Sequence, residues 1–157
     1  MFGIKQQLDI KNITSENLSQ AKSIIRKVFP VAYSENFYKD VLSNHGYSKL
    51  AYLDNLPIGV MCCKLCETDG VKKIYITVLG CLVPYRGQGY GTALLNEVYL
   101  LVKNQNNKSK IICLHVQSSN ELALSFYRKH GFKIIKKESN YYRRLKPSSA
   151  FMLQKIL

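Results

Sequence analysis

Three glycines stand within five residues of this chain, at Gly87, Gly89 and Gly91, and helix-forming sequence begins directly after them. The whole segment, residues 83–98, reads VPYRGQGYGTALLNEV. Glycines allow backbone N–H groups to approach a ligand closely, and the N-terminus of a helix carries a partial positive charge. Arg86 adds a full charge beside them. The segment therefore predicts a binding site for an anion such as a pyrophosphate.

Two common phosphate-binding motifs do not fit this segment. A P-loop requires Lys-Ser or Lys-Thr after its last glycine, and Gly91 is followed by Thr92 and an alanine. A dinucleotide fingerprint requires a third glycine where this chain has Thr92, and residues 110–117 contain no acidic side chain for a ribose. The remaining pattern is Arg86-x-x-Gly89-x-Gly91 between a strand and a helix. A glycine-rich turn without a ligand is the structural alternative.

Tyr75 and His115 are polar residues inside apolar, strand-like runs of the sequence. A buried polar group needs a hydrogen-bond partner, and histidine and tyrosine can both act as general acids or bases. A lone histidine in such a run is, however, also typical of a core position whose hydrogen bonds are satisfied. The residue types alone leave this choice open.

The chain contains five cysteines, and four of them fall within apolar, strand-like runs. This pattern indicates reduced thiols that serve as small core residues in a reducing compartment. Cys63 and Cys66 form a Cys-x-x-Cys, which raises a metal or redox hypothesis. Zinc requires four ligands, however, and His45, His115 and His130 stand apart from that pair in the sequence. We therefore expect no metal. The cysteines are Cys62, Cys63, Cys66, Cys81 and Cys113.

The chain has 23 lysines and arginines against 10 aspartates and glutamates, a formal net charge of +13. Such a charge attracts anions, including nucleic acid, the ribosome surface and phosphorylated cofactors. The lysines are scattered, however, and no RNA-binding motif with interleaved aromatic residues accompanies them. No apolar run approaches the roughly 20 residues that a membrane span needs. We therefore expect one soluble domain, residues 1–157, in the cytoplasm, with the nucleus as the alternative location.

The hydrophobic periodicity predicts a mixed α/β sheet with flanking helices and one parallel step in its middle. A strand at residues 8–14 precedes a helix that opens at Ser15 and stops at Pro30, and a second helix follows Ser34. Ser118 begins a capping box, Ser-Ser-Asn-Glu, before a later helix that closes at Gly131. The other expected elements are strands at 49–53, 57–66, 72–83, 110–116, 132–137 and 149–157 and a helix at 89–102, with turns at 54–55 and 68–70.

Two motifs of the chain resemble the GNAT superfamily of acetyl-CoA-dependent N-acetyltransferases. Arg-Gly-Gln-Gly-Tyr-Gly follows an apolar strand, and Ser-Asn-Glu with Phe-Tyr-Arg-Lys-His-Gly-Phe comes about 30 residues later in the sequence. Further segments, spread over nearly the whole chain, are similar to the NatE-type, or San-type, protein N-terminal acetyltransferases; they are residues 29–33, 37–40, 75–81, 114–117 and 140–142. The resemblance implies the GNAT fold, an α/β fold with a mixed, mostly antiparallel central sheet, a splayed parallel strand pair and flanking helices.

The resemblance also implies where acetyl-CoA binds. The strand that ends near Leu79 would splay from its parallel neighbour, so that the Leu79 amide faces the acetyl oxygen. The glycine-rich segment would bind the pyrophosphate. Asn120 and Tyr127 would lie along the pantetheine, with Tyr127 protonating the leaving sulfur, although simple packing on the sheet is the alternative for Tyr127. The full set is Leu79, Gly80, Cys81, Leu82, Arg86, Gly87, Gln88, Gly89, Tyr90, Gly91, Thr92, Asn120 and Tyr127.

For the reaction itself, the resemblance implies that Tyr75 and His115 hold a water and together act as the general base. A groove of aromatic and proline residues would bind the peptide, with an apolar cup near Phe29 and Val31 for a methionine side chain. Thr77 and Val78 replace bulkier apolar residues of the family, which leaves the second-residue preference of the substrate open. The residues expected to bind substrate are Phe29, Pro30, Val31, Tyr33, Tyr75, Thr77, His115, Tyr141, Tyr142 and Leu145.

The pKa values of amines favour an α-amine over a lysine as the acceptor. Deprotonation at neutral pH costs about 1 kcal/mol for an α-amine with a pKa near 8, and about 4–5 kcal/mol for a lysine with a pKa near 10.4. We therefore expect acetylation of proteins that begin with Met and a hydrophobic residue, with slower acetylation of lysines. Two alternatives remain. One is a non-catalytic CoA-binding subunit that works with a large helical-repeat NatA-type auxiliary protein on the ribosome, and the other is a small-amine acetyltransferase, which the basic charge disfavours.

Overall fold

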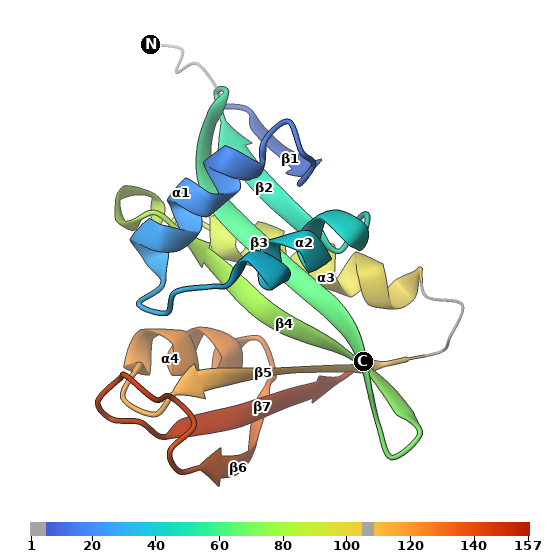
Figure 1. Ribbon diagram of the computed structural model, residues 1–157, viewed down its shortest axis with the longest axis vertical. Coiled ribbons are helices and arrows are strands. Elements are labelled where there is room, and N and C mark those ends of the chain that lie inside the picture. The colour runs from blue at the N-terminus through green and yellow to red at the C-terminus, as the bar shows by residue number, and fades with distance from the viewer. Residues whose placement is uncertain (1–5, 105–108) are drawn as a thin grey trace. The chain divides into compact units, whose positions relative to one another are not determined.

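The computed structural model of the chain describes residues 6–104 and 109–157 (Figure 1). None of the helices in these ranges is long and apolar enough to cross a membrane. The elements in chain order are β1 (Leu8–Asn12), α1 (Leu18–Val28), α2 (Glu35–Ser43), β2 (Ser48–Leu53), β3 (Leu56–Thr68), β4 (Val71–Cys81), the 3-10 turn η1 (Val83–Tyr85), α3 (Tyr90–Lys103), β5 (Ile111–Gln117), α4 (Glu121–Lys129), β6 (Lys133–Glu138) and β7 (Ala150–Ile156).

The strands form a seven-stranded sheet in the order β1-β2-β3-β4-β5-β7-β6. β4 and β5 run parallel, with Ile74 paired to Ile112 and Tyr75 paired to Cys113. The described pairs β1–β2, β2–β3, β5–β7 and β6–β7 are antiparallel. The predicted mixed, mostly antiparallel α/β sheet with one parallel step is therefore confirmed. The splay of β4 and β5 beyond this register stays a prediction.

By its internal contacts the chain divides into two compact units. The first unit contains the described residues up to Lys64 together with Val78–Leu101, and the second contains Leu65–Thr77 and the described residues from Val102 onward. β3 and β4 contribute residues to both units. The glycine-rich segment therefore belongs to the first unit, whereas Tyr75 and His115 belong to the second. The single domain that the chain length suggests stays a prediction.

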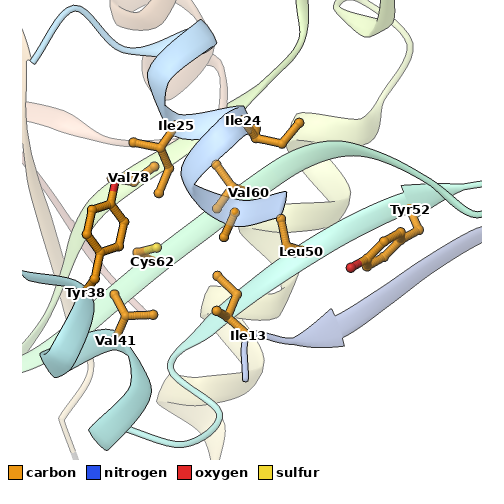
Figure 2. Close-up of a cluster of buried hydrophobic side chains, with 11 residues drawn as sticks. Ile13, Ile24, Ile25, Tyr38, Val41, Leu50, Tyr52, Val60, Cys62 and Val78 are labelled. Carbon is orange, nitrogen blue, oxygen red and sulfur yellow. The ribbon is translucent and has the colours of Figure 1, made fainter. Parts of the chain in front are cut away.

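The core of the first unit forms where α1 and α2 pack on β2 and β3 (Figure 2). α1 is amphipathic and buries one stripe of apolar side chains, as the i, i+3, i+4 spacing predicts. The C-terminal end of α1 packs against the same cluster through Val28 and Phe29, so the cluster also fixes the start of the following loop. The cluster consists of Ile13, Ala21, Ile24, Ile25, Tyr38, Val41, Leu50, Tyr52, Val60, Cys62 and Val78.

α3 covers the other face of the strands in the first unit. Figure 1 shows α1 and α2 in front of β2 and β3 and α3 behind these strands. A Cβ atom at Gly59 of β3 would lie 3.1 Å from Cδ1 of Leu94 in α3, so the helix and the strand approach closely at this glycine. Leu94, Leu95 and Val98 are fully buried. The start of α3, where the glycine-rich segment ends, is thereby fixed on the sheet.

The expected start of the first helix was wrong, because α1 begins at Leu18 rather than at Ser15. The preceding residues form a turn that is held by side chains. The backbone N–H of Thr14 donates to Oδ1 of Asn17 at 2.8 Å, and Nδ2 of Asn17 donates to the carbonyl of Asn12 at 3.0 Å. Asparagine and threonine compete with the helix for backbone partners in this way. The expected cap of α2 is confirmed, since Oγ of Ser34 accepts the N–H of Phe37 at 3.2 Å.

The predicted capping box of the later helix was also wrong in detail. The cap of α4 is Asn120, whose Oδ1 accepts the N–H of Ala123 at 3.2 Å. Ser118 is instead paired with the chain before β7, because its Oγ lies 2.6 Å from Oγ of Ser149. Its backbone N–H donates to the carbonyl of Ser149 at 3.0 Å. A partner 31 residues away therefore outcompetes the local cap.

Four of the five cysteines are buried and pack as small core residues, as predicted; they are Cys62, Cys63, Cys81 and Cys113, whereas Cys66 is half-buried. Burial raises the pKa of the Cys81 and Cys113 thiols to about 11. Both groups are therefore neutral thiols at physiological pH, and a neutral thiol is a poor nucleophile.

Candidate active site

The glycine-rich segment connects β4 to α3 through η1. Gly87 and Gly89 have φ angles of +74° and +90°. A Cβ atom at either position would meet nothing within 4 Å, so the backbone conformation, and not crowding, requires glycine there. The carbonyl of Gly89 accepts the N–H of Ala93 at 3.0 Å and thereby begins α3. The segment thus combines two glycines that face open space with the N-terminus of a buried helix, which is an arrangement that suits an anion.

Arg86 and Gln88 brace this segment by donating to backbone carbonyl groups. Nε of Arg86 donates to the carbonyl of Cys81 at 3.2 Å, and Nε2 of Gln88 donates to the carbonyl of Pro84 at 3.0 Å. The backbone N–H of Arg86 donates to the carbonyl of Val83 at 3.2 Å. Arg86 therefore ties the end of β4 to the segment. The expected hydrogen bond from the backbone N–H of Arg86 to a pyrophosphate stays a prediction. That N–H would then donate both to the pyrophosphate and to the carbonyl of Val83.

Gly80 allows the end of α1 to lie close to β4. A Cβ atom on Gly80 would stand 2.8 Å from Cγ1 of Val28, which is too close unless one of them moves, and 3.1 Å from Cζ of Phe29, which is a tight contact. A position expected to contact the cofactor is thus in direct contact with Phe29, a residue expected to contact substrate. Both residues belong to the first unit.

The other positions expected to bind the cofactor fall in both units. In the first unit, Leu79 is half-buried in β4, Cys81 is buried, and the N–H of Leu82 donates to the carbonyl of Ile58 at 2.8 Å. Tyr90, Gly91 and Thr92 form the first turn of α3. In the second unit, Asn120 caps α4 and Tyr127 lies in the same helix. Their contacts with acetyl-CoA stay predictions.

Tyr127 is buried in the second unit among aromatic rings. Its ring centroid lies 5.1 Å from that of Phe126 and 5.2 Å from that of Phe132, both in edge-to-face geometry. These two rings come from α4 itself and from the residue before β6, so the packing on the sheet that the structural alternative expects stays untested. The expected role of Tyr127, protonation of the leaving sulfur, stays a prediction.

Tyr75 and His115 lie on the same face of the sheet in the second unit. Tyr75 pairs in register with Cys113, and His115 follows two residues later on β5, so the side chains point to one side. Oη of Tyr75 lies 2.6 Å from Nδ1 of His115. The structure therefore brings together the two residues that the family resemblance implies as the base. Because they touch each other directly, a water that both residues hold would bind beside the pair.

The other ring nitrogen of His115 has a partner that the sequence analysis missed. Nε2 of His115 lies 2.5 Å from Oε2 of Glu138, at the end of β6. Oε1 of the same carboxylate accepts Nζ of Lys136 at 2.9 Å. The hydrogen bonds from Lys136 and His115 hold the pKa of Glu138 below its usual range. The imidazole thus lies between a phenol and a carboxylate.

Two tyrosines from the loop between β6 and β7 complete this cluster. The ring of Tyr141 stacks on the imidazole of His115, and Oη of Tyr141 lies 3.2 Å from Oη of Tyr75. The ring of Tyr142 stands edge-on to Tyr141 at 4.9 Å. Burial, followed by the hydrogen bond with Tyr141, raises the pKa of Tyr75 well above its usual value. Tyr75 is therefore a neutral phenol over the physiological pH range, which suits it to donate to an imidazole and receive a proton in return.

The residues expected to bind the peptide form two sets. Phe29, Pro30, Val31 and Tyr33 occupy the connection between α1 and α2, where Pro30 is exposed and the others are half-buried. Tyr141, Tyr142 and Leu145 lie between β6 and β7, and Thr77 is half-buried in β4. The first set therefore lies in the α1–α2 connection of the first unit, and the second set lies in the β6–β7 loop and in β4 of the second unit. A peptide groove between the sets stays a prediction.

Among residues 6–104 and 109–157, no three His, Cys, Asp or Glu side chains gather in a way that could hold a metal ion. Cys63 is buried in β3 beside Met61, with Sγ 3.4 Å from Sδ of that residue.

Comparison with known proteins identifies the family of the chain. The Acetyltransferase (GNAT) family pattern matches residues 11–132. The chain therefore belongs to the GNAT family of acetyltransferases. Within that family it is 42% identical over 154 residues, 98% of this chain and 91% of the relative, to N-alpha-acetyltransferase 50 of Danio rerio. It is 37% identical over 153 residues, 98% of this chain and 83% of the relative, to the probable N-acetyltransferase san of Drosophila melanogaster.

A solved structure gives the same grouping. The structure of Arabidopsis thaliana Naa50 in complex with the bisubstrate analogue CoA-Ac-MVNAL superimposes with a TM-score of 0.88 at 36% sequence identity, and the match covers 96% of this chain and 99% of that chain. Within the family, the chain therefore groups with Naa50 and San by both sequence and fold.

Proposed function

We propose that this chain transfers the acetyl group of acetyl-CoA to the α-amine of polypeptides that begin with methionine. The observation that carries the proposal is the match to Naa50, whose bound analogue joins CoA through an acetyl group to a peptide beginning with Met. Tyr75 and His115, which are hydrogen-bonded at 2.6 Å, support it independently, because a protein that only binds CoA has no need of a proton relay.

Acetyl-CoA fits the glycine-rich segment by chemistry. Its pyrophosphate is an anion that suits the open backbone at Gly87 and Gly89 and the N-terminus of α3. The Arg86 side chain holds the segment in shape through the carbonyl of Cys81. Each interaction of an anion with a helix N-terminus contributes roughly 0.3–2 kcal/mol, so several such contacts together are needed to hold the cosubstrate.

The reaction forms a C–N bond and breaks the C–S bond of the thioester. The neutral α-amine attacks the acetyl carbonyl, and the amine nitrogen loses one proton. The C–S bond breaks so that CoA leaves as a thiolate, which takes up one proton, and the reaction as a whole neither gains nor loses a proton. Tyr75 and His115 provide the route for that proton, which passes to Oη of Tyr75, directly or through a water held beside the pair. The phenol proton of Tyr75 moves to Nδ1 of His115 in the same step. Such a relay contributes typically 10²–10⁴-fold to a rate.

The acceptor that suits this base is an α-amine. Its pKa lies about 2.4–2.7 units below that of a lysine side chain, so at neutral pH its neutral fraction is about 250- to 500-fold larger. Lysine side chains are therefore slower substrates of the same site. For the first residue, the half-buried Phe29 and Val31 supply an apolar surface that suits a methionine side chain.

The proposed location of the chain is the cytoplasm, at the ribosome. Its proposed partner there is a large helical-repeat NatA-type auxiliary subunit. The formal net charge of +13 supports this setting, since a basic surface is attracted to ribosomal RNA. The nucleus is the alternative location.

The experiment that tests the proposed function is thiol release from acetyl-CoA with a Met-Leu peptide. The free peptide is compared with the same peptide acetylated beforehand, and the wild type with His115→Ala and Tyr75→Phe. His45→Ala, at an exposed loop position, is the matched control. We expect turnover only with the free α-amine, a loss of about 10²-fold or more in both relay variants, and no loss in the control. Binding of CoA without peptide turnover would favour the non-catalytic subunit, and turnover of small amines alone would favour the small-amine acetyltransferase.

A further inference from the structure

Glu138 is the one acidic side chain within hydrogen-bond distance of the His115 ring among the described residues. Its Oε2 lies 2.5 Å from Nε2 of His115, and its Oε1 accepts Nζ of Lys136 at 2.9 Å. The side chain of His115 is 13% exposed and that of Glu138 is 30% exposed. The carboxylate is thus fixed by two partners, at the rim of the cluster.

We propose that Glu138 is a positioning residue that holds His115 in the tautomer with the proton on Nε2, so that the lone pair of Nδ1 faces Tyr75. The inference deepens the proposed function and rests on it. It adds a third member to the proton relay, in the order Tyr75, His115, Glu138, and this member touches neither substrate.

The tautomer follows from the hydrogen-bond roles of the three groups. An ionised carboxylate can only accept, so Nε2 of His115 must carry the proton that it donates to Glu138. In a neutral imidazole the other nitrogen is then unprotonated, and Nδ1 accepts the O–H of Tyr75. The opposite tautomer would direct an N–H of His115 at Tyr75 Oη, and the relay could not take up a proton from that side.

Side chains from four described segments lie beside His115. β4 brings Tyr75, the β6–β7 loop brings Tyr141, and β7 brings the uncharged Met152 opposite His115. β6 brings Glu138 and, on its other oxygen, Lys136. Glu138 therefore supplies the negative charge that would face an imidazolium once Nδ1 has taken the proton. Removing that charge also removes its stabilisation of the protonated ring.

A shift of strand register places Glu138 on the correct face of the sheet. Lys136 pairs with Met152, as does His115 on the other side of β7, and Glu138 pairs with Ala150. The β6–β7 register shifts between Ile134 and Lys136. Because a shift of one residue moves every later side chain to the other face, Glu138 would point away from His115 without it.

The test is ring ¹⁵N NMR of the free protein, compared between the wild type and Glu138→Gln. The His115 signals are those that disappear in His115→Gln. Glutamine can both accept and donate, so it permits either tautomer. We expect protonated Nε2 and unprotonated Nδ1 in the wild type, and a clear share of the Nδ1-protonated form in Glu138→Gln. Glu67→Gln, at an exposed position of β3, is the matched control and should give the wild-type spectrum.

Steady-state kinetics of the same variants give the second readout. We expect kcat of Glu138→Gln to fall about tenfold to hundredfold, with KM for acetyl-CoA unchanged, because residues that orient a catalytic histidine have effects of this size. An Nδ1-protonated His115 in the wild type, or a spectrum and kcat of Glu138→Gln equal to those of Glu67→Gln, would overturn the inference. A wild type that shows the expected tautomer but acetylates no peptide would overturn the proposed function and leave the assigned tautomer standing.

Discussion

The ring of Tyr141 lies flat against the imidazole of His115, with centroids 4.1 Å apart and ring planes 12° from parallel. Tyr141 also places its hydroxyl 3.2 Å from Oη of Tyr75. One loop residue therefore contacts both members of the pair, through its face in one case and through its hydroxyl in the other. This relationship couples the β6–β7 loop to the geometry of the base.

Removing the Tyr141 ring should slow turnover more than removing its hydroxyl. A stacked aromatic pair contributes about 0.5–1.5 kcal/mol, so Tyr141→Ala should lower kcat about twofold to tenfold. Tyr141→Phe keeps the stack on His115 and should stay within about twofold of the wild type. Steady-state thiol release with the Met-Leu peptide measures both. Equal losses in the two variants would show that the hydroxyl, and not the stacked ring, supports His115.

Gly89→Ala should weaken the binding of acetyl-CoA. The φ angle of +90° at Gly89 costs an L-residue roughly 1–2 kcal/mol, and the chain can relieve that strain only by moving the segment that would face the pyrophosphate. The matched control is Gly70→Ala, because Gly70 has φ of +77° with nothing within 4 Å but lies in the β3–β4 turn. Calorimetric titration should show weaker binding in Gly89→Ala alone, although both variants lose stability. Equal binding in both variants would contradict the assigned site.

Gly80→Ala should destabilise the first unit through Val28 and Phe29. The new Cβ would stand 2.8 Å from Cγ1 of Val28, and such overpacking costs typically about 1–3 kcal/mol. Val28→Ala removes the clashing methyl group, so the double variant should be more stable than the sum of the single changes predicts. Urea unfolding of the four proteins measures this coupling. If the changes in unfolding free energy simply add, the new Cβ at position 80 does not clash with Val28.

Alkaline pH should reduce the stability of the wild type more than that of Tyr75→Phe. Burial raises the pKa of Tyr75 above its usual value, so the folded chain favours the neutral phenol. The resulting stability is fully present below the unfolded pKa of about 10 and is lost as the pH rises beyond it. The difference in unfolding free energy between the two proteins should be constant from about pH 7 to pH 9 and should then shift in favour of Tyr75→Phe. A difference that stays constant above pH 10 would contradict the burial of a neutral Tyr75.

The sequence predicted the elements well wherever the signal is local. Asp54, Asn55, Asp69 and Gly70 all have positive φ angles in the two hairpin turns, and these are the residue types that adopt this conformation most readily. The alternation of apolar residues placed every strand to within a few residues of its observed ends. The glycine-rich turn at Gly87–Gly91 before α3 was located from a local pattern too.

The errors came from contacts that a local pattern does not contain. Ser118 lost its expected cap role because it is hydrogen-bonded to Ser149, and Ser15 did not start α1 because Asn17 holds a turn before it. Glu138 was missed because its approach to His115 depends on two strand registers and on the shift in β6. The one signal available was an acidic residue directly after the basic segment KIIKK of that strand. No spacing rule connects two residues that are 23 positions apart on different strands.

The measurement that tests the central claim most directly locates the acetyl group on a peptide that offers both amines. A peptide with a free Met-Leu N-terminus and one internal lysine is incubated with acetyl-CoA and the wild-type chain near neutral pH, and tandem mass spectrometry assigns the modified nitrogen over time. We expect acetylation of the α-amine first, faster than the lysine by about a hundredfold or more, because a much larger fraction of the α-amine is neutral near pH 7. Acetylation of the lysine at an equal or greater rate would contradict this expectation.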